Sequence, residues 1–220
     1  MEISKQTFNP NDMYHMFDVQ IIEKDIWYFK NVLSYPQDLL KFVHQLDSDE
    51  RTHGTITKWE DWTASNDATL LYGNNKNILT NNVSNKIDGG RLDQKILYVK
   101  NSFEMAAQMS FEMYLSAHQL DKNMYSLPME NIPLRRWAKG SSMGPHCDSY
   151  DGDTDLAFSM ITYINDDYEG GEIHFPNHNI SLKPAAGSLV MFPSQEPYLH
   201  EVKEVMSGER YTSHLSAYKL

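Results

Sequence analysis

The sequence predicts an α+β domain that is mainly β, in which helices come first and a compact β unit follows. Two patterns in the 220 residues predict this class. Before residue 121, apolar residues recur at three- and four-residue steps, as they do on one face of an α-helix. From residue 131 onward, short apolar or alternating runs are divided by Gly, Pro, Asn and Asp, which is typical of an antiparallel sandwich or barrel.

The N-terminal half begins with an early strand followed by a turn, over residues 18–29. A helix is expected next, opening at Tyr35-Pro36, because proline is tolerated in the first turn of a helix. Its apolar face consists of Leu39, Leu40, Val43 and Leu46, and the polar residues 47–50 end it.

Residues 74–90 are rich in Asn and Gly, which predicts a loop or two short strands with mobile turns. Two roles stay open for this segment: a solvent-exposed connection, or a flap over an active site. The clearest helix follows at Asp93–Leu120, where the apolar stripe indicates packing against a sheet.

Short apolar runs in the C-terminal half are the candidate strands of the β unit. They are Leu134–Ala138, Asp155–Ile164, Glu172–Phe175, Ile180–Lys183, Ser188–Phe192, His200–Val205 and Arg210–Tyr218. We therefore expect one domain over residues 1–220, in which helices and accessory strands at 1–129 support a β core at 130–220.

Composition limits the function classes. The net charge is −11 and the basic residues do not cluster, so a broad face for duplex nucleic acid is not expected. Cys147 is the only cysteine, which rules out an intrachain disulfide and favours a reducing compartment. Neither an apolar run of membrane-spanning length nor a signal peptide at residues 1–10 is evident, so we expect a cytoplasmic protein without a membrane partner.

The pair His146-x-Asp148 is the first candidate site. With 9 histidines and 30 acidic residues in the chain, about one such spacing is expected by chance. Its setting adds information, because Gly144-Pro145 precede it and strand patterns flank it. On a strand, residues two apart face the same way, so both side chains would point into one cavity. The alternative is a surface pair in an acidic loop.

His200 and Arg210 each open a predicted strand, with Val202 and Thr212 on their respective faces. A hairpin from His200 to Arg210 would place the two strands side by side. The alternatives are a structural histidine and a surface ion pair that contributes at most about 1 kcal/mol.

Together these residue types point to one chemistry. Two histidines and a carboxylate can hold one face of an iron(II) ion and leave the opposite face open. An arginine offers a two-pronged grip to a carboxylate. His146, Asp148, His200 and Arg210 therefore predict an oxygen-activating iron enzyme with a dicarboxylate co-substrate.

Residues 130–220 resemble the iron(II)/2-oxoglutarate oxygenases, most closely the prolyl 4-hydroxylase branch. The resemblance lies in the order and spacing of the following motifs: Trp137-Ala-Lys-Gly140, His146-Cys-Asp148, Tyr163-Ile-Asn165, Gly170-Gly-Glu172-Ile-His-Phe175, Pro184-Ala-Ala-Gly187-Ser-Leu-Val-Met-Phe192, His200 and Arg210. It implies a double-stranded β-helix, or jelly roll, buttressed by the N-terminal helices.

The resemblance also implies a set of site residues. Iron(II) would be bound by His146, Asp148 and His200, with no catalytic residue beyond these ligands. Arg210 would bind the far carboxylate of 2-oxoglutarate, with Thr212 as a possible helper. Further residues match positions that line the co-substrate pocket: Ile161, Tyr163, Ile173 and Val202. Dioxygen is the second co-substrate, and ascorbate a possible addition.

The implied reaction hydroxylates a peptidyl residue such as proline and releases succinate and CO2. A free amino acid, a nucleobase or another small molecule is the alternative substrate. A non-catalytic jelly-roll binding protein with a vestigial metal site is the alternative class.

Some positions depart from the family or stay undecided. Trp137 stands where the family has a tyrosine, so its indole N–H either replaces the phenol or only forms wall, and Met143 replaces a frequent aromatic. The branch often has lysine in place of Arg210. The sequence does not decide whether Arg135-Arg136 face the substrate. The pair His174 and His178 is interpreted as surface histidines, and Cys147 as a packing residue. The acidic loop Asp151–Asp155 is interpreted as solvated, with contact to a cationic substrate as the alternative, because it is next to the site in the sequence.

Overall fold

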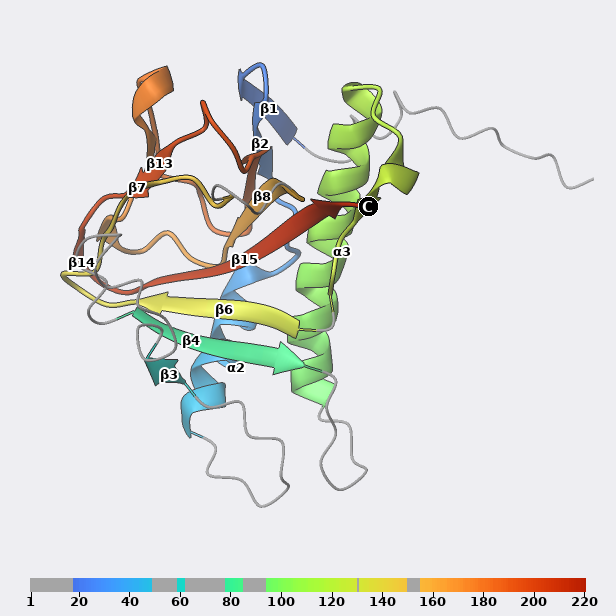
Figure 1. The fold of residues 1–220 in the computed structure, drawn as a ribbon. Helices are drawn as coiled ribbons and strands as arrows, with labels where there is room; N and C mark the ends of the chain where they lie inside the picture. The colour runs from blue at the N-terminus through green and yellow to red at the C-terminus, as the bar shows by residue number, and fades with distance from the viewer. Residues whose placement is uncertain (1–17, 49–58, 62–77, 85–93, 130, 150–154) are drawn as a thin grey trace, which may run out of the picture.

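The computed structural model describes residues 18–48, 59–61, 78–84, 94–129, 131–149 and 155–220. Within these residues strands predominate, and all pairings between them are antiparallel. One long helix, α3 (Gln94–Ala117), lies along a large sheet (Figure 1). The predicted class, α+β and mainly β, is confirmed.

The described strands form one large and one small sheet, with a further two-stranded pair. From edge to edge, the large sheet contains β1 (Asp18–Glu23), β2 (Ile26–Lys30), β12 (Leu189–Pro193), β8 (Leu156–Tyr163), β15 (Arg210–Lys219), β6 (Asn131–Trp137), β4 (Ile78–Ser84) and β3 (Glu60–Asp61), and β5 (Tyr125–Ser126) pairs with β15. The small sheet contains β11 (Ile180–Leu182), β10 (Ile173–Phe175), β13 (His200–Val202) and β7 (Met143–His146). The extra pair is β14 (Val205–Ser207) with β9 (Glu169–Gly170).

The predicted helices are confirmed. Helix α2 (Pro36–Ser48) begins at the proline, and Asp38 in its first turn suits the positive end of the helix dipole. Helix α3 lies within the predicted range. Short 3-10 helices follow at η3 (Lys122–Met124) and η4 (Pro176–His178). Among the described residues, no helix is long and apolar enough to cross a membrane.

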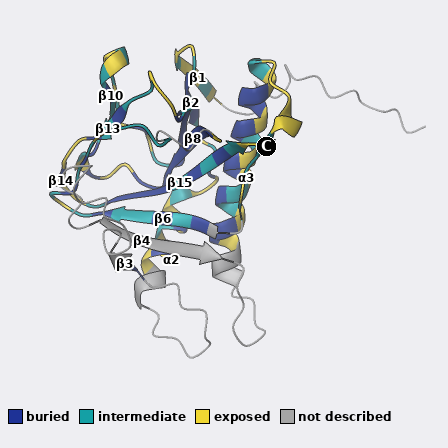
Figure 2. Ribbon diagram, viewed as in Figure 1, coloured by how far each residue is buried: buried dark blue, intermediate teal, exposed yellow. Residues whose placement is uncertain are grey.

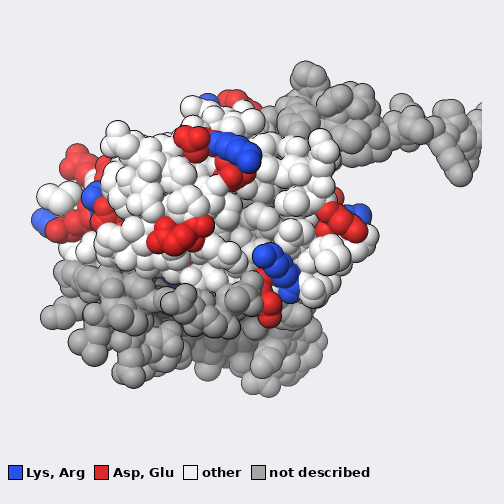
Figure 3. All heavy atoms as spheres, turned by 45° about the horizontal axis from the view of Figure 1, so that its top comes forward, with Lys and Arg blue, Asp and Glu red and all other residues white. Residues whose placement is uncertain are grey.

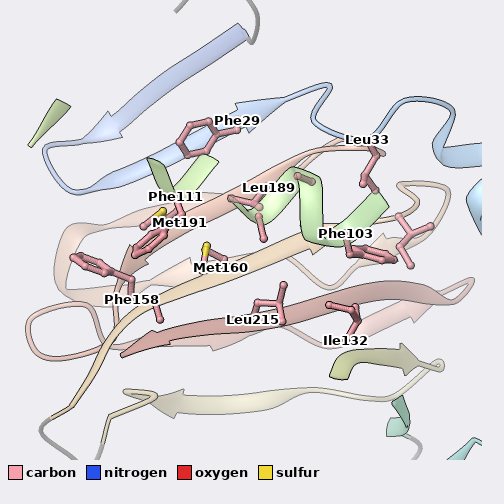
Figure 4. Packing of buried hydrophobic residues seen from close by; sticks show 14 of the residues in the cluster. Phe29, Leu33, Phe103, Phe111, Ile132, Phe158, Met160, Leu189, Met191 and Leu215 are labelled. Carbon is pink, nitrogen blue, oxygen red and sulfur yellow. The ribbon is translucent and has the colours of Figure 1, made fainter. Parts of the chain in front are cut away.

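The main core lies between α3 and one face of the large sheet. Phe103 and Phe111 of the helix pack over Met160, Leu189 and their neighbours (Figure 4). Buried residues concentrate on β8, on β15 and on the side of α3 that faces them (Figure 2). The apolar stripe predicted on the long helix is therefore a packing surface.

The opposite face of the large sheet is also buried, and it carries polar groups that line a cavity. Every residue of β8 is buried. Met160 packs toward α3, whereas Ile161 belongs to a second apolar cluster. On β15, Leu215 likewise packs in the main core, and Arg210 and Thr212 line a cavity. The period of two along a strand thus separates a core face from a cavity face.

The candidate strands of the C-terminal half are confirmed to within a few residues at their ends. The predicted hairpin from His200 to Arg210 is wrong. Strand β13 pairs with β7 and β10 in the small sheet, whereas β15 pairs with β8 and β6 in the large one. The chain between them forms β14, which pairs with β9, so it crosses from one sheet to the other instead of turning back.

Two further local expectations need correction. Asp148 does not lie on a strand, because β7 ends at His146. Strand β7 itself was not predicted, because it contains Gly144 and Pro145, two residue types that are rare in strands. Of residues 74–90, only 78–84 are described, and they form the single strand β4 beside β6. The suggested flap extends beyond the described residues and stays a prediction.

Basic and acidic side chains are interspersed on the face of the molecule shown in Figure 3. Among the described residues, Nζ of Lys30 lies 3.2 Å from Oδ2 of Asp18. Surface pairs of this kind contribute little to stability.

Candidate metal centre

Three potential metal ligands converge between the two sheets. His146 ends β7 and His200 begins β13, and these residues are direct partners across the two strands. Asp148 follows in the loop after β7. Its Oδ1 lies 3.6 Å from Nε2 of His146, and its Oδ2 lies 3.6 Å from Nε2 of His200. The ligand atoms all lie within 4.8 Å of one another, so one ion could contact all three.

Backbone carbonyls orient both imidazoles. Nδ1 of His146 lies 2.9 Å from the carbonyl oxygen of Gly144, and Nδ1 of His200 lies 3.2 Å from that of Tyr198. A carbonyl only accepts, so each Nδ1 carries a hydrogen, and in the neutral form of such a ring the lone pair is on Nε2. In both rings Nε2 is the nitrogen near Asp148. Histidines that bind a metal typically have this arrangement, in which the other ring nitrogen donates to a carbonyl or carboxylate oxygen.

Hydroxyl groups of the large sheet hold the carboxylate. Ser159 Oγ donates to Oδ2 of Asp148 at 2.5 Å, and the Oγ atoms of Ser159 and Ser194 are 2.8 Å apart. Burial alone would raise the pKa of Asp148, but the neighbouring histidines outweigh burial and hold this pKa well below its usual value. Burial lowers the pKa of His200 to about 4, against the opposing effect of Asp148. At neutral pH the Asp148 carboxylate is therefore charged and the His200 imidazole is neutral, the forms in which these groups bind a metal.

Arg210 is the second element of the site. It is 1% exposed, and its guanidinium carbon lies 4.8 Å from the ring centre of Trp137 and 5.0 Å from that of Tyr163. Nη2 donates to Tyr163 Oη at 3.4 Å, but the buried Nε and Nη1 make no hydrogen bond to any described residue. The alternative of a surface ion pair is excluded. A buried cation with two unpaired N–H groups indicates an anionic ligand, because burial without a partner is costly.

One cavity joins the two elements. Strands of both sheets contribute to its lining, as does the loop that carries Asp148. The described lining residues are Arg135, Trp137, Met143, His146, Asp148, Ile161, His200, Val202, Arg210, Thr212 and His214. Most of the residues predicted from the sequence are therefore brought together. Tyr163 and Ile173 are not among them: Tyr163 stacks on Arg210, and Ile173 packs with Ile161 in the apolar cluster behind the wall.

Trp137 both lines the cavity and makes a polar contact through its indole N–H. Its Nε1 donates to Thr212 Oγ1 at 3.1 Å, while its ring stacks on Arg210. Since the Thr212 oxygen accepts this bond, its own hydrogen is left to donate to a ligand in the cavity.

Sequence reasoning missed two groups beside Asp148, His214 and Ser159, and left Arg135 undecided. His214 is buried with Nε2 3.6 Å from Oδ2 of Asp148, and Ser159 holds the same oxygen. Arg135 lines the cavity, whereas Arg136 pairs with Glu209 through Nε at 2.9 Å. Period-two alternation from Arg210 through Thr212 would have found His214, and alternation back from Trp137 would have found Arg135.

The other candidates lie apart from this centre. His178 stacks on Tyr198, and His174 Nε2 is 3.9 Å from Glu201 Oε1. Neither joins a group of potential metal ligands among the described residues. Cys147 is half-buried and does not line the cavity, and burial raises its pKa to about 11. The acidic loop at 151–155 lies, except for its last residue, outside the described residues.

Fold and site together define a mostly β protein in which two histidines, one carboxylate and a buried arginine line the same cavity. Residues 132–215 match the model of the 2OG-Fe(II) oxygenase superfamily. This match covers the β unit that carries the three potential metal ligands and Arg210, so this part of the chain is similar to that superfamily.

Individual relatives show the same similarity. A PKHD-type hydroxylase of Prochlorococcus marinus (strain MIT 9215) is 29% identical over 160 residues, which cover 70% of this chain and 63% of the relative. The aligned part is thus less than two thirds of that protein.

Solved structures are similar in fold. A viral collagen prolyl hydroxylase from Paramecium Bursaria Chlorella virus-1 aligns with a TM-score of 0.58 at 17% identity, covering 90% of this chain and 97% of that one. A prolyl hydroxylase from Trichoplax adhaerens, in complex with a hypoxia inducible factor peptide fragment, aligns with a TM-score of 0.58 at 16% identity, covering 96% and 89%.

Proposed function

We propose that this chain is an iron(II)- and 2-oxoglutarate-dependent hydroxylase. The reaction converts a C–H bond, dioxygen and 2-oxoglutarate into a C–OH group, succinate and CO2. One observation carries the proposal: the buried Arg210, whose Nε and Nη1 make no hydrogen bond to a described residue, lines the same cavity as the three potential iron ligands. A dicarboxylate that reaches from the arginine to the metal accounts for both features.

The donor set fits iron(II). His146, Asp148 and His200 would hold the ion, and two imidazoles with one carboxylate suit an iron that keeps open positions for a 2-oxo acid and dioxygen. When bound, the ion supplies the activation of dioxygen for attack on a C–H bond. Ser159 keeps the carboxylate oriented, and the carbonyl-bonded Nδ1 atoms keep the imidazoles oriented.

The co-substrate would be held by several side chains of the large sheet. Arg210 would pair with the far carboxylate through Nε and Nη1, in the fork geometry that fixes the direction of the ligand. Thr212, oriented by Trp137, would donate to the same carboxylate. Val202 and Ile161 would cover the carbon chain and exclude water from the reacting centre.

We further propose that the two facing sheets form a double-stranded β-helix, and that residues 1–220 act as one oxygenase domain. Contacts between the halves support a single domain, since α3 packs directly on β8, β12 and β6.

For the substrate, we propose a peptidyl residue such as proline. Support comes from the likeness to prolyl hydroxylases, one of which was solved with a peptide. A free amino acid, a nucleobase or another small molecule is the alternative for the same chemistry.

The test has two stages. Anaerobic addition of 2-oxoglutarate to the iron(II)-loaded protein should give a visible charge-transfer band, and admission of oxygen with ascorbate should release succinate. Arg210→Met should lose both at ordinary co-substrate concentrations, whereas Arg136→Gln, which alters an arginine bonded to Glu209, should keep them. Absence of band and succinate in the wild-type protein would favour a non-catalytic binding protein.

A further inference from the structure

His214 lines the same cavity as the potential metal ligands and Arg210. It lies four residues after Arg210 on β15, with Thr212 between them, and all three residues line the cavity. Alternate residues of a strand share a face, and two residues cover about 7 Å along it. The cavity face of β15 is therefore a row of polar groups that has Arg210 at one end and His214 at the other.

Nε2 of His214 has no hydrogen-bond partner. This nitrogen is buried and makes no hydrogen bond to any described residue. The direct partner of His214 on β8 is Ile161, whose side chain neither donates nor accepts. Oδ2 of Asp148 lies 3.6 Å from Nε2, which is too far for a hydrogen bond, and already accepts from Ser159 at 2.5 Å. Because buried polar atoms are normally bonded, the nitrogen indicates a position for a ligand.

His214 lies next to the metal centre but is not one of its ligands. Among the described residues, the group whose ligand atoms come close enough to share one ion consists of His146, Asp148 and His200. Nε2 of His214 lies beside this group, at the Asp148 carboxylate. A molecule bound to the ion on the Asp148 side would therefore come within reach of this nitrogen.

We propose that His214 binds the metal-end carboxylate of 2-oxoglutarate, to which Nε2–H donates a hydrogen bond. This inference rests on the proposed function and deepens it. With the far carboxylate paired to Arg210, the second carboxylate lies at the ion, near that of Asp148. Two carboxylates so close repel each other, and an N–H donor to the second one offsets part of that repulsion.

The proposal also fixes the position of one hydrogen. In His146 and His200, Nδ1 donates to a backbone carbonyl, which leaves Nε2 to bind a metal. No hydrogen bond to a described residue imposes this form on His214. Its Nε2 is thus able to carry the hydrogen, and the same ring type serves as donor at one place and as metal ligand at the other two.

Two ligands that differ only at the metal-end carboxylate test the proposal. 2-Oxoglutarate has a carboxylate next to its oxo group, whereas 4-oxopentanoate has a methyl group there, and both keep the far carboxylate. Calorimetry measures the dissociation constant of each ligand for the protein saturated with manganese(II). The affinity ratio of 2-oxoglutarate to 4-oxopentanoate then reports the contribution of the metal-end carboxylate, and the measurement needs no turnover.

His214→Leu should lower this affinity ratio about tenfold, because one hydrogen bond to a charged group is lost. His214→Gln should restore part of it, since the Gln amide also donates from a flexible side chain. The affinity for 4-oxopentanoate should stay unchanged in both variants. Arg210→Met should weaken the binding of both ligands, because both have the far carboxylate.

Ser159→Ala is the matched control. It removes a hydrogen bond to Asp148 without removing a residue that lines the cavity. We expect it to weaken manganese(II) binding and to leave the affinity ratio unchanged once the ion saturates the site. If His214 acted only through Asp148, His214→Leu would give this same pattern, and that result would overturn the proposal.

Two further results would overturn it: an equal loss of affinity for both ligands in His214→Leu, or no recovery of the ratio in His214→Gln. Circular dichroism shows whether the variants fold, and His214→Phe, which fills the space of the ring, takes the place of a Leu variant that does not. The proposed function stands in these cases if the charge-transfer band still forms. If wild-type protein binds neither ligand and gives no band, the proposed function fails with the inference.

Discussion

Nε2 of His214 lies 3.6 Å from Oδ2 of Asp148, the oxygen that also accepts the hydrogen bond from Ser159. His214 comes from β15 and Ser159 from β8, so neighbouring strands of the large sheet both support a carboxylate carried by the loop after β7. The position of the carboxylate is therefore set from outside its own segment.

Loss of the Ser159 hydroxyl should weaken the metal site. Ser159→Ala removes the hydrogen bond to Asp148, and support of this kind typically contributes 10- to 100-fold to metal affinity. Titration of the metal-free protein with iron(II) measures the change. Ser213→Ala is the control, because the buried Ser213 hydroxyl makes no hydrogen bond to a described residue. Equal affinities in the two variants would contradict the role given to Ser159.

Acid should destabilise the metal-free protein before the carboxylate titrates. Burial lowers the pKa of His200 and of His214 to about 4, while the unfolded value stays near 6.5. The unfolded chain then binds more protons between these values, so the free energy of unfolding falls as the pH drops from about 6.5 to 4. We expect a loss of a few kcal/mol. Urea unfolding at pH 7, 5.5 and 4.5 measures it, and a flat profile would refute it.

Loss of the hydrogen bond between Trp137 and Thr212 should weaken the binding of 2-oxoglutarate. Trp137→Phe keeps an aromatic face for Arg210 and removes the indole N–H, so we expect the KM for 2-oxoglutarate to rise roughly fivefold, equivalent to about 1 kcal/mol. Thr212→Val should act similarly. Because the two residues share one interaction, the double variant should cost less than the product of the single effects. Fully multiplicative effects would show that the residues act independently.

A substitution in the core under α3 should lower the stability of the protein without changing its co-substrate affinity. Phe103 is fully buried against the large sheet, so Phe103→Ala should lower the free energy of unfolding by about 3–5 kcal/mol. Chemical denaturation gives the value. The protein that stays folded should form the charge-transfer band with unchanged co-substrate affinity, since Phe103 does not line the cavity. A matching loss of affinity would mean that α3 positions the site.

Much of this architecture could be predicted from the sequence, because apolar periodicity reports which face of an element is buried. The stripe on the long helix and the runs that became β8, β12 and β15 are examples. The positions of His146, Asp148, His200 and Arg210 in one cavity were also expected. Pairing between distant strands was not accessible in this way, and this explains the wrong hairpin.

The missed residues have the same origin. Ser159 and His214 become site residues only because the large sheet turns their face toward a carboxylate from a distant loop. Strand β7 was hidden by Gly144-Pro145, whose types normally interrupt strands. Local patterns therefore predicted the elements, while tertiary pairing decided which polar side chains meet.

The donor set of the metal centre has a mechanical consequence. Two of its members, His146 and His200, belong to the small sheet, whereas Asp148 is tied through Ser159 to the large sheet. An ion bound by all three residues would link the small sheet to the large sheet at the cavity. Loading with metal should then raise the melting temperature and slow amide exchange in β7 and β13 more than in β1, which lies at the far edge of the large sheet.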